Sequence, residues 1–477
     1  MKPYRISQLK TPAQFREALD SLGLDLHFDE ELIPGASGPL GQPYTLKDGF
    51  VIGNRFCIQP MEGWDGTTEG RPTEFTFRRW ERFGMSGGKL VWGGEAVAVS
   101  PEGRANPNQL TFAPRHVEDL KRLRQRLVAA HAEQHGDTSN LLIGVQLTHS
   151  GRFSRPLGPP APVILYHHPY LDARVHIGPD YRLVSDEEIQ GIIQDYLCAA
   201  VQAAEAGFDF VDVKHCHGYL GHEFLSAYSR PGPYGGSLEN RTRFMREIIA
   251  GIRQRLPHMR IGVRFSIFDT IPYQPGPDGS GVPVPRLDQH NYWFGADPAD
   301  PLQINLEEPK ALLKMLQTLG VELVNLSGGS PYYNPHIQRP ALVPPCDGYL
   351  PPEDPLVGVA RQVGVDGELK RSFPGLLIVG SAYSYLQEWL PNVAQYNVRS
   401  GLVDFVGIGR GILSYPEMPC DVLAGKPLQR KKICRSFSDC TTAPRSGLVS
   451  GCYPLDEFYK SSDMAKNLAE VKRPART

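Results

Sequence analysis

The segment VDVKHCHGYL, residues 211–220, carries Lys214, His215, Cys216, His217 and Tyr219 directly after an alternating apolar run. A lysine in a dry site can form a Schiff base with a carbonyl substrate. It can also act with a neighbouring histidine as a charged donor that polarises a substrate oxygen. Metal binding through the two histidines is disfavoured, because no standard ligand spacing accompanies them.

The direction of these side chains depends on the strand that carries them. Alternation along a strand places Asp212 and Lys214 on one face and His215 on the other. The flanking valines must meet helices, so the polar pair is expected to point inward, with His217 and Tyr219 in the following loop. An inward ion pair between Asp212 and Lys214 is the purely structural alternative.

Eight short apolar runs, each followed by a segment with helical spacing, predict repeated strand-helix units around a parallel sheet. Eight such units close into an α/β fold of the (β/α)₈ TIM-barrel type, whereas an open doubly wound sheet would require a glycine fingerprint that is absent. The predicted strands are 55–61, 89–97, 141–149, 208–215, 260–266, 321–328, 376–382 and 403–410.

The remaining sequence predicts three regions and two long loops. An N-terminal arm, 1–49, precedes the barrel at 50–420, and a cysteine-containing tail, 421–477, follows it. Insertions at 151–184 and 270–303 follow the third and fifth strands. Barrel sites are built at the carboxyl ends of the strands, so both insertions are candidate lids or specificity loops, with plain surface excursions as the alternative.

Composition limits the partners and the compartment. Net charge is −2, from 50 basic and 52 acidic residues, so nothing favours nucleic acid or an anionic membrane surface. The first residues, MKPYRISQLK, lack a following apolar segment, and no apolar run approaches ~20 residues. Eight scattered cysteines suit reduced thiols. These features predict a cytoplasmic protein that binds neither nucleic acid nor a membrane, and they leave homo-oligomerisation open.

Several ordered segments carry a resemblance to a known family. Residues 207–249, which include YGGSLENR, closely resemble the fourth strand, loop and helix of the Old Yellow Enzyme family of FMN-dependent ene-reductases. NRFCIQPM, GGEAVAVSPEGR, IGVQLTHSGR, GVRFS, LIVGSA and VGIGRGIL agree in the same order. The resemblance covers roughly residues 50–415 and implies a (β/α)₈ barrel that holds FMN over the strand ends.

The resemblance also implies which positions contact the cofactor. Pro60 and Met61 would pack beside the flavin ring, Ala96 and Gln146 would bind its pyrimidine edge, and Arg264 would place positive charge near N1 and O2. Backbone N–H groups would hold the phosphate around Ser327, Gly328, Gly380, Ser381, Gly409 and Arg410. That placement agrees with the tendency of barrels to bind phosphate after strands seven and eight.

For the substrate, the resemblance implies that Lys214 and His217 hydrogen-bond the activating oxygen and that Tyr219 supplies a proton. Tyr166, in the first insertion, is a further candidate contact. Lys214 departs from the family's histidine, and its charge would favour a more anionic acceptor. Glu62 is a second departure, at a position where family members often carry cysteine or threonine. A carboxylate there, beside the flavin, would oppose negative charge on the reduced ring.

The tail is reminiscent of the 2,4-dienoyl-CoA reductase subgroup, whose members carry an iron–sulfur cluster after the barrel. Cys440 and Cys452 keep the spacing of the last two ligands, but Cys434 is displaced and Ser436 and Phe437 stand where a ligand is expected. Four cysteines are the rule for such clusters, so a cluster-free tail is favoured over a cluster on these three.

Together these features predict an FMN-dependent oxidoreductase that passes hydride from NADH or NADPH through flavin N5 to an activated alkene such as an enone, or runs the reverse desaturation. Two alternatives stay open. One is a Schiff-base lyase or aldolase-like barrel that uses Lys214, and the other is a flavin-binding protein without catalytic turnover.

Overall fold

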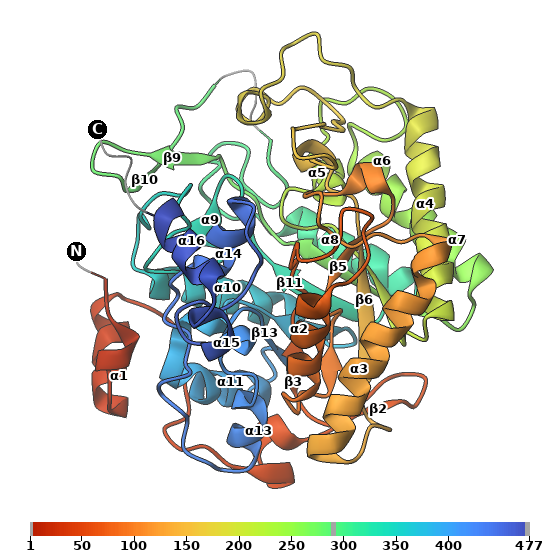
Figure 1. Cartoon of the computed structure of the whole chain (residues 1–477). Helices are drawn as coiled ribbons and strands as arrows, with labels where there is room; N and C mark the ends of the chain where they lie inside the picture. Colours follow the sequence, from red (N-terminus) through yellow and green to blue (C-terminus); the bar gives the residue numbers. More distant parts are fainter. Residues whose placement is uncertain (1–2, 288–291, 473–477) are drawn as a thin grey trace.

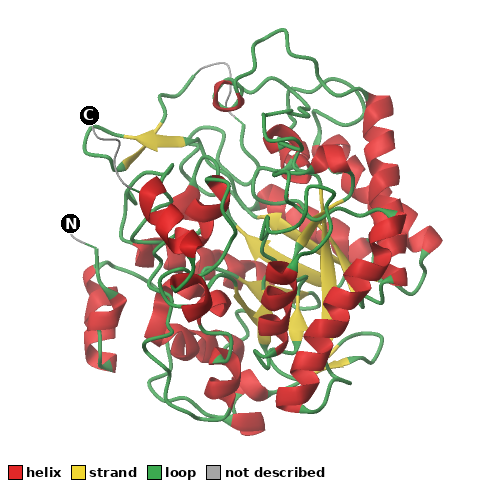
Figure 2. Cartoon of the chain, viewed as in Figure 1, coloured by secondary structure: helices red, strands yellow, loops and turns green. Residues whose placement is uncertain are grey.

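The computed structural model describes residues 3–287 and 292–472, and a closed barrel of parallel strands forms its centre (Figures 1 and 2). All eight predicted strands are present, and the second is split into two short pieces. The barrel strands are β3 (Phe56–Ile58), β4 (Leu90–Val91) with β5 (Ala96–Ala98), β6 (Leu142–Thr148), β7 (Phe210–Val213), β8 (Arg260–Ser266), β11 (Leu323–Ser327), β12 (Leu377–Gly380) and β13 (Phe405–Ile408).

The strand pairing closes the sheet and confirms the predicted (β/α)₈ barrel. Neighbours pair in chain order, β13 pairs with β3, and β4 pairs with both β3 and β6. The register sets Gln146 beside Asp212 and Asn325 beside Arg264. Polar side chains from adjacent strands therefore meet at the same level, close to the carboxyl ends of the strands.

Helices surround the strands, as the strand-helix alternation predicts (Figure 2). Ser185 forms a capping box with Glu188 at the start of α4, which satisfies free N–H groups of the first turn of this helix. The helices outside the barrel are α2 (Glu74–Gly84), α3 (Val117–His135), α4 (Asp186–Glu205), α7 (Arg243–Arg255), α8 (Glu307–Thr318), α10 (Pro355–Ser372), α11 (Leu390–Arg399), α12 (Gly411–Ser414) and α13 (Met418–Leu423).

Two apolar layers follow from strand alternation. Trp92 and Phe210 meet edge-on inside the barrel, with ring centroids 5.2 Å apart. An antiparallel hairpin of β1 (Tyr44–Thr45) and β2 (Val51–Ile52) packs against the same interior cluster. Val211 and Val213 instead join the larger cluster between strands and helices. The hairpin thus closes one end of the barrel, and the site must open at the other.

The segments outside the barrel pack onto it. In the N-terminal segment, α1 (Pro12–Ser21) lies against η8 (Tyr383–Trp389), where Phe15 stacks on Trp389 with centroids 4.8 Å apart. The chain ends with α14 (Asp439–Arg445), α15 (Glu457–Lys460) and α16 (Asp463–Val471). The insertions hold short elements, namely η6 (Gly151–Phe153), η7 (Ala173–Val175), β9 (Tyr273–Pro275) and β10 (Gly281–Pro283).

Among the described residues, the helices are too short or too polar for any of them to cross a membrane.

Candidate active site

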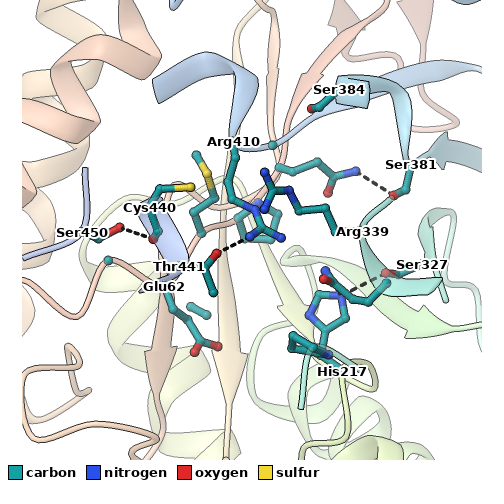
Figure 3. Close-up of a pocket in the computed structure, with 18 of the residues that line it drawn as sticks. Glu62, His217, Ser327, Arg339, Ser381, Ser384, Arg410, Cys440, Thr441 and Ser450 are labelled. Atoms are coloured by element: carbon teal, nitrogen blue, oxygen red, sulfur yellow. Dashed lines mark hydrogen bonds between the residues drawn. The ribbon is translucent and has the colours of Figure 1, made fainter. Parts of the chain in front are cut away.

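A cavity opens at the carboxyl ends of the barrel strands, where residues from nearly every strand converge (Figure 3). Its walls come from the loops after β3, β7, β11, β12 and β13 and from α14. Most of the side chains predicted to bind cofactor or substrate line it: Pro60, Met61, Ala96, Gln146, Lys214, His217, Tyr219, Arg264, Ser327, Ser381, Gly409 and Arg410.

Three predicted positions lie elsewhere. Gly328 and Gly380 are adjacent to lining residues but do not themselves line the cavity. Tyr166 is buried with Arg152 over its ring and is also absent from the lining. The described parts of the insertions 151–184 and 270–303 contribute no lining residue, and residues 288–291 lie outside the described structure.

The floor of the cavity is a buried polar chain across β6, β7 and β8. Gln146 Nε2 donates to Asp212 Oδ2 at 2.5 Å, and Asp212 Oδ1 accepts the backbone N–H of Arg264 at 2.7 Å. Burial raises the pKa of Asp212 to about 6, with these hydrogen bonds opposing the shift. Both carboxylate oxygens of Asp212 therefore accept hydrogen bonds from Gln146 and Arg264. The inward Asp212–Lys214 ion pair, the structural alternative from the sequence, does not form.

Lys214 pairs with Glu62 instead. Its Nζ lies 2.5 Å from Glu62 Oε1, while Tyr219 Oη donates to Glu62 Oε2 at 2.6 Å. Lys214 Nζ also sits 3.9 Å from the centroid of the Tyr219 ring, and Tyr332 Oη lies 2.9 Å from Tyr219 Oη. Burial, and then Glu62, raises the pKa of Tyr219 well above its usual value.

The loop that carries Glu62 is anchored by a buried ion-pair network. Arg79, from α2, contacts Asp65 at 2.9 Å and Glu95 at 2.6 Å, and all three side chains are nearly inaccessible to solvent. Glu95 also accepts the backbone N–H of Gly63 at 3.0 Å. The carboxylate of Glu62 is therefore presented by a loop with few alternative conformations.

His217 faces the cavity from the loop after β7, with the left-handed backbone conformation φ 69°. Its Nε2 lies 2.9 Å from Ser327 Oγ, and its backbone N–H donates to Ser266 Oγ at 3.1 Å. Burial, followed by the nearby Arg264 and Lys214, lowers the pKa of His217 well below its usual value. A neutral imidazole is thus available to a substrate oxygen.

Three cavity arginines lack a carboxylate partner among the residues that the structure describes. Arg264 is buried, and its Nε has no hydrogen-bond partner within residues 3–287 and 292–472. Arg410 and Arg339 lie close together in the cavity, where Arg410 donates to the hydroxyl of Thr441 (Figure 3). Arg339 donates to the hydroxyl of Ser438. Burial, and then Arg339, lowers the pKa of Arg410 to about 9.

Unpaired buried charge is costly, so this arrangement fits a bound anion. A phosphate dianion suits the pair of Arg410, which follows β13, and Arg339, which follows α9 (Pro335–Gln338). β13 is the eighth barrel strand, and barrels commonly bind phosphate after strands seven and eight. Arg264, deeper in the cavity, suits a ring that gains negative charge on reduction. FMN carries both groups, and the residues present fit it.

The C-terminal segment forms one wall of the cavity. Cys440, Thr441, Pro444 and Arg445 of α14, with Ser450 beyond it, face the same space as the strand loops. Arg445 is held by Asp347 at 2.7 Å. Burial, and then the neighbouring Cys434 and Cys440, raises the pKa of the Cys452 thiol to about 12. Within residues 3–287 and 292–472, no group of three or more His, Cys, Asp or Glu side chains could hold a metal ion.

Some lining residues carry no signal in the sequence. Arg339 and Tyr332 lie in a segment of mixed composition after the strand predicted at 321–328. Thr441 and Arg445 lie in the tail, well beyond the last predicted strand at 403–410. Gln59 could have been found, because it belongs to a predicted strand, and it exchanges hydrogen bonds with Asn325.

Fold and site together define a class: a (β/α)₈ barrel whose strand-end cavity is built for an anionic flavin mononucleotide. The family model for the NADH:flavin oxidoreductase / NADH oxidase family matches residues 39–282. The chain belongs to this family. Membership implies FMN as cofactor, in agreement with the resemblance predicted from the sequence.

The curated relatives that match this chain include bacterial NADPH dehydrogenases. NADPH dehydrogenase of Bacillus subtilis (strain 168) is 33% identical over 219 residues, which are 44% of this chain and 59% of that protein. NADPH dehydrogenase of Geobacillus sp. (strain WCH70) is 28% identical over 391 residues, 80% of this chain and 92% of that protein. With the first of these relatives, the chain spans about three fifths of the relative's length.

Solved structures share the fold at low sequence identity. An Old Yellow Enzyme homologue from Zymomonas mobilis has a TM-score of 0.56 at 21% identity, over 82% of this chain and 94% of that one. A 2-naphthoyl-CoA reductase complex has a TM-score of 0.65 at 19% identity, over 89% of this chain and 58% of that one. These likenesses support the barrel and not a substrate.

Proposed function

We propose that this protein is an NAD(P)H-dependent flavin oxidoreductase that reduces an activated alkene, such as an enone. FMN, when bound, supplies the hydride chemistry by accepting hydride from the nicotinamide and delivering it to carbon. The chain's own residues hold that cofactor, orient the alkene and manage one proton. The reverse desaturation would use the same residues.

Each part of the cavity has a role in this proposal. Arg339 and Arg410 hold the phosphate, and Gln146 and Arg264 face the ring. His217 donates to the oxygen that activates the alkene and draws electron density from the β-carbon. Tyr219 delivers the proton to the α-carbon, on the same wall as Glu62 and Lys214. Lys214 lies beside this site, within reach of the same oxygen once a substrate enters.

The observation that carries the proposal is the convergence in one cavity of His217, Tyr219 and three arginines, for which the described part of the chain supplies no carboxylate partner. A Schiff-base role for Lys214 is less favoured, because its Nζ is paired with a carboxylate and nucleophilic attack requires a free amine.

The test is anaerobic turnover of purified protein with NADPH or NADH and 2-cyclohexenone, with the saturated ketone as the expected product. Lys214→Ala is expected to slow alkene reduction while leaving flavin reduction by the nicotinamide nearly intact. Absence of the saturated ketone with wild-type protein would contradict the proposal. Equal loss of both half-reactions in Lys214→Ala would contradict the position of Lys214 beside the substrate.

A further inference from the structure

The Tyr219 hydroxyl is not free in this structure. It donates to Glu62 Oε2 at 2.6 Å, and its other hydroxyl contact is Tyr332 at 2.9 Å. Glu62 in turn accepts from Lys214 Nζ at 2.5 Å. The three side chains Tyr219, Glu62 and Lys214 therefore form a continuous hydrogen-bonded path, and all three line the cavity.

The charges along this path indicate why Tyr219 requires a proton source on the far side of Glu62. A tyrosinate left after proton donation would stand beside a carboxylate in a site where Tyr219 is only 3% exposed. Two adjacent negative charges in a buried site are strongly unfavourable. A proton from Tyr332, whose hydroxyl lies 2.9 Å away, would only move the charge to a second, partly buried tyrosine. Lys214, 3% exposed at its side chain and bonded to the same carboxylate, is a cation whose proton can remove one of the two charges.

We propose that Glu62 is a positioning residue that relays a proton from Lys214 to Tyr219. This inference rests on the proposed alkene reduction and deepens it. When hydride has reached the β-carbon, the Tyr219 O–H bond breaks and its proton forms the new C–H bond at the α-carbon. The Lys214 Nζ–H bond then breaks and its proton passes to the Glu62 carboxylate. The resulting carboxylic acid turns its O–H toward the Tyr219 oxygen and releases the proton there, which re-forms the Tyr219 O–H bond and leaves a neutral amine that takes up a solvent proton.

Charge balances at every stage of this sequence. The added hydride brings one negative charge onto the substrate, and the proton from Tyr219 neutralises it. The relay then converts a Lys214–Glu62 pair of zero net charge into a neutral lysine with a carboxylate, of charge −1. Uptake of one solvent proton restores the starting pair, so no further oxidant or reductant is required.

The experiment measures reoxidation of the NADPH-reduced holoenzyme by 2-cyclohexenone in an anaerobic stopped-flow apparatus. Positioned proton transfer contributes about 10²- to 10⁴-fold, so Glu62→Gln should slow reoxidation by at least ~10-fold and enlarge the solvent deuterium isotope effect. Glu62→Asp, which keeps the carboxylate, should recover part of the rate. Flavin reduction by NADPH should change less than reoxidation does in both variants, because it needs no proton from Tyr219.

Tyr332→Phe is the matched control, because it removes a hydroxyl contact of Tyr219 and leaves the carboxylate path intact. It should slow reoxidation less than Glu62→Gln does. A second readout is independent of turnover. In protein labelled at the tyrosine ¹³Cζ, the resonance assigned by its loss in Tyr219→Phe should shift in Glu62→Gln.

The outcomes separate the two proposals. If wild-type flavin is not reoxidised by the enone, the proposed function is wrong. If it is, and Glu62→Gln matches the wild type in rate and isotope effect, the relay is wrong. The relay is also wrong if Glu62→Asp gives no recovery, if Tyr332→Phe slows reoxidation as much as Glu62→Gln, or if the Tyr219 resonance is unmoved.

Discussion

At the scale of single residues, Glu62 and Lys214 form one unit. In the sequence each is a separate departure from the family, with Lys214 favouring anionic acceptors and Glu62 opposing a reduced flavin. Their side chains lie 2.5 Å apart, so each charge is largely offset by the other. Because Lys214 is paired, its charge no longer favours an anionic substrate. The same pair offsets the negative charge of Glu62, which was expected to oppose reduction of the flavin.

The pair makes a prediction about stability. Lys214→Met should lower the free energy of unfolding by about 2–4 kcal/mol, because it leaves a mostly buried carboxylate without its partner. Glu62→Gln combined with Lys214→Met should recover at least ~1 kcal/mol of that loss. Urea unfolding of the single and double variants measures both values.

The control is Lys310→Met, because Lys310 and Glu368 form an ion pair that is exposed to solvent. That change should cost no more than ~1 kcal/mol. A Lys214→Met variant no less stable than Lys310→Met would contradict the importance of the buried pair.

The arginines at the phosphate end make a second residue-scale prediction. Arg339→Gln and Arg410→Gln should each weaken FMN binding by about 10- to 100-fold, the loss of one charge-assisted hydrogen bond worth ~1.5–3 kcal/mol. Fluorescence titration of apoprotein with FMN measures the change. Arg445→Gln is the matched control, because Arg445 lines the same cavity but is neutralised by Asp347. Equal weakening in all three variants would contradict the assignment.

At the scale of elements, α10 supports the turn after β12. Asp366, fully buried, accepts the backbone N–H of Ser381 at 3.2 Å and the side-chain amide of Gln362 at 2.8 Å. The N–H of Ser381, predicted to face the phosphate, is therefore already engaged. The Ser381 hydroxyl donates a hydrogen bond to the carbonyl of Leu326 and accepts one from Gln59 Nε2. Ser381 also lines the cavity.

Burial raises the pKa of Asp366 from 3.8 to about 8. Between these values the folded protein keeps a proton that the unfolded chain has released, so Asp366 lowers stability as pH rises through that window. Asp366→Asn should therefore raise the thermal midpoint relative to wild type more at pH 8.5 than at pH 5. The same difference between variant and wild type at both values would contradict the buried, protonated state.

The elements also show how far sequence reasoning reaches. The eight strands could be predicted because each is a short apolar run whose burial is local information, and β8 coincides with its predicted range. The split of the second strand could not, because Gly93 adopts a positive φ of 136° that no periodicity reveals. The convergence of the 331–340 loop with α14 depends on contacts between segments roughly a hundred residues apart, which leave no local pattern.

At the scale of the whole molecule, the last helices complete the active-site wall. Asp456 joins this region to α2 through Arg78 at 2.9 Å, and it also caps α15. Tyr453, Tyr459 and Leu468 form a small apolar cluster that includes Phe75 of α2. The cavity therefore depends on residues 434–471 staying docked on the barrel.

Asp456→Ala should loosen this docking. Loss of a helix cap costs ~1 kcal/mol, and the unpaired Arg78 adds to it. Limited proteolysis should cut within residues 424–471 faster than in wild type, while the barrel resists. Asp463→Ala is the control, since the ion pair of Asp463 with Lys466 is exposed. Unchanged cleavage in Asp456→Ala would contradict the role of this contact.

The central claim is that a flavin in this cavity carries electrons from a nicotinamide to an activated alkene. The most direct test is the visible spectrum of the purified protein under anaerobic conditions, recorded before NADPH or NADH, after it, and after 2-cyclohexenone. The account predicts flavin bands that bleach with the nicotinamide and return with the enone. A colourless protein that cannot be reconstituted with FMN, or flavin bands that never return with an enone, would contradict it.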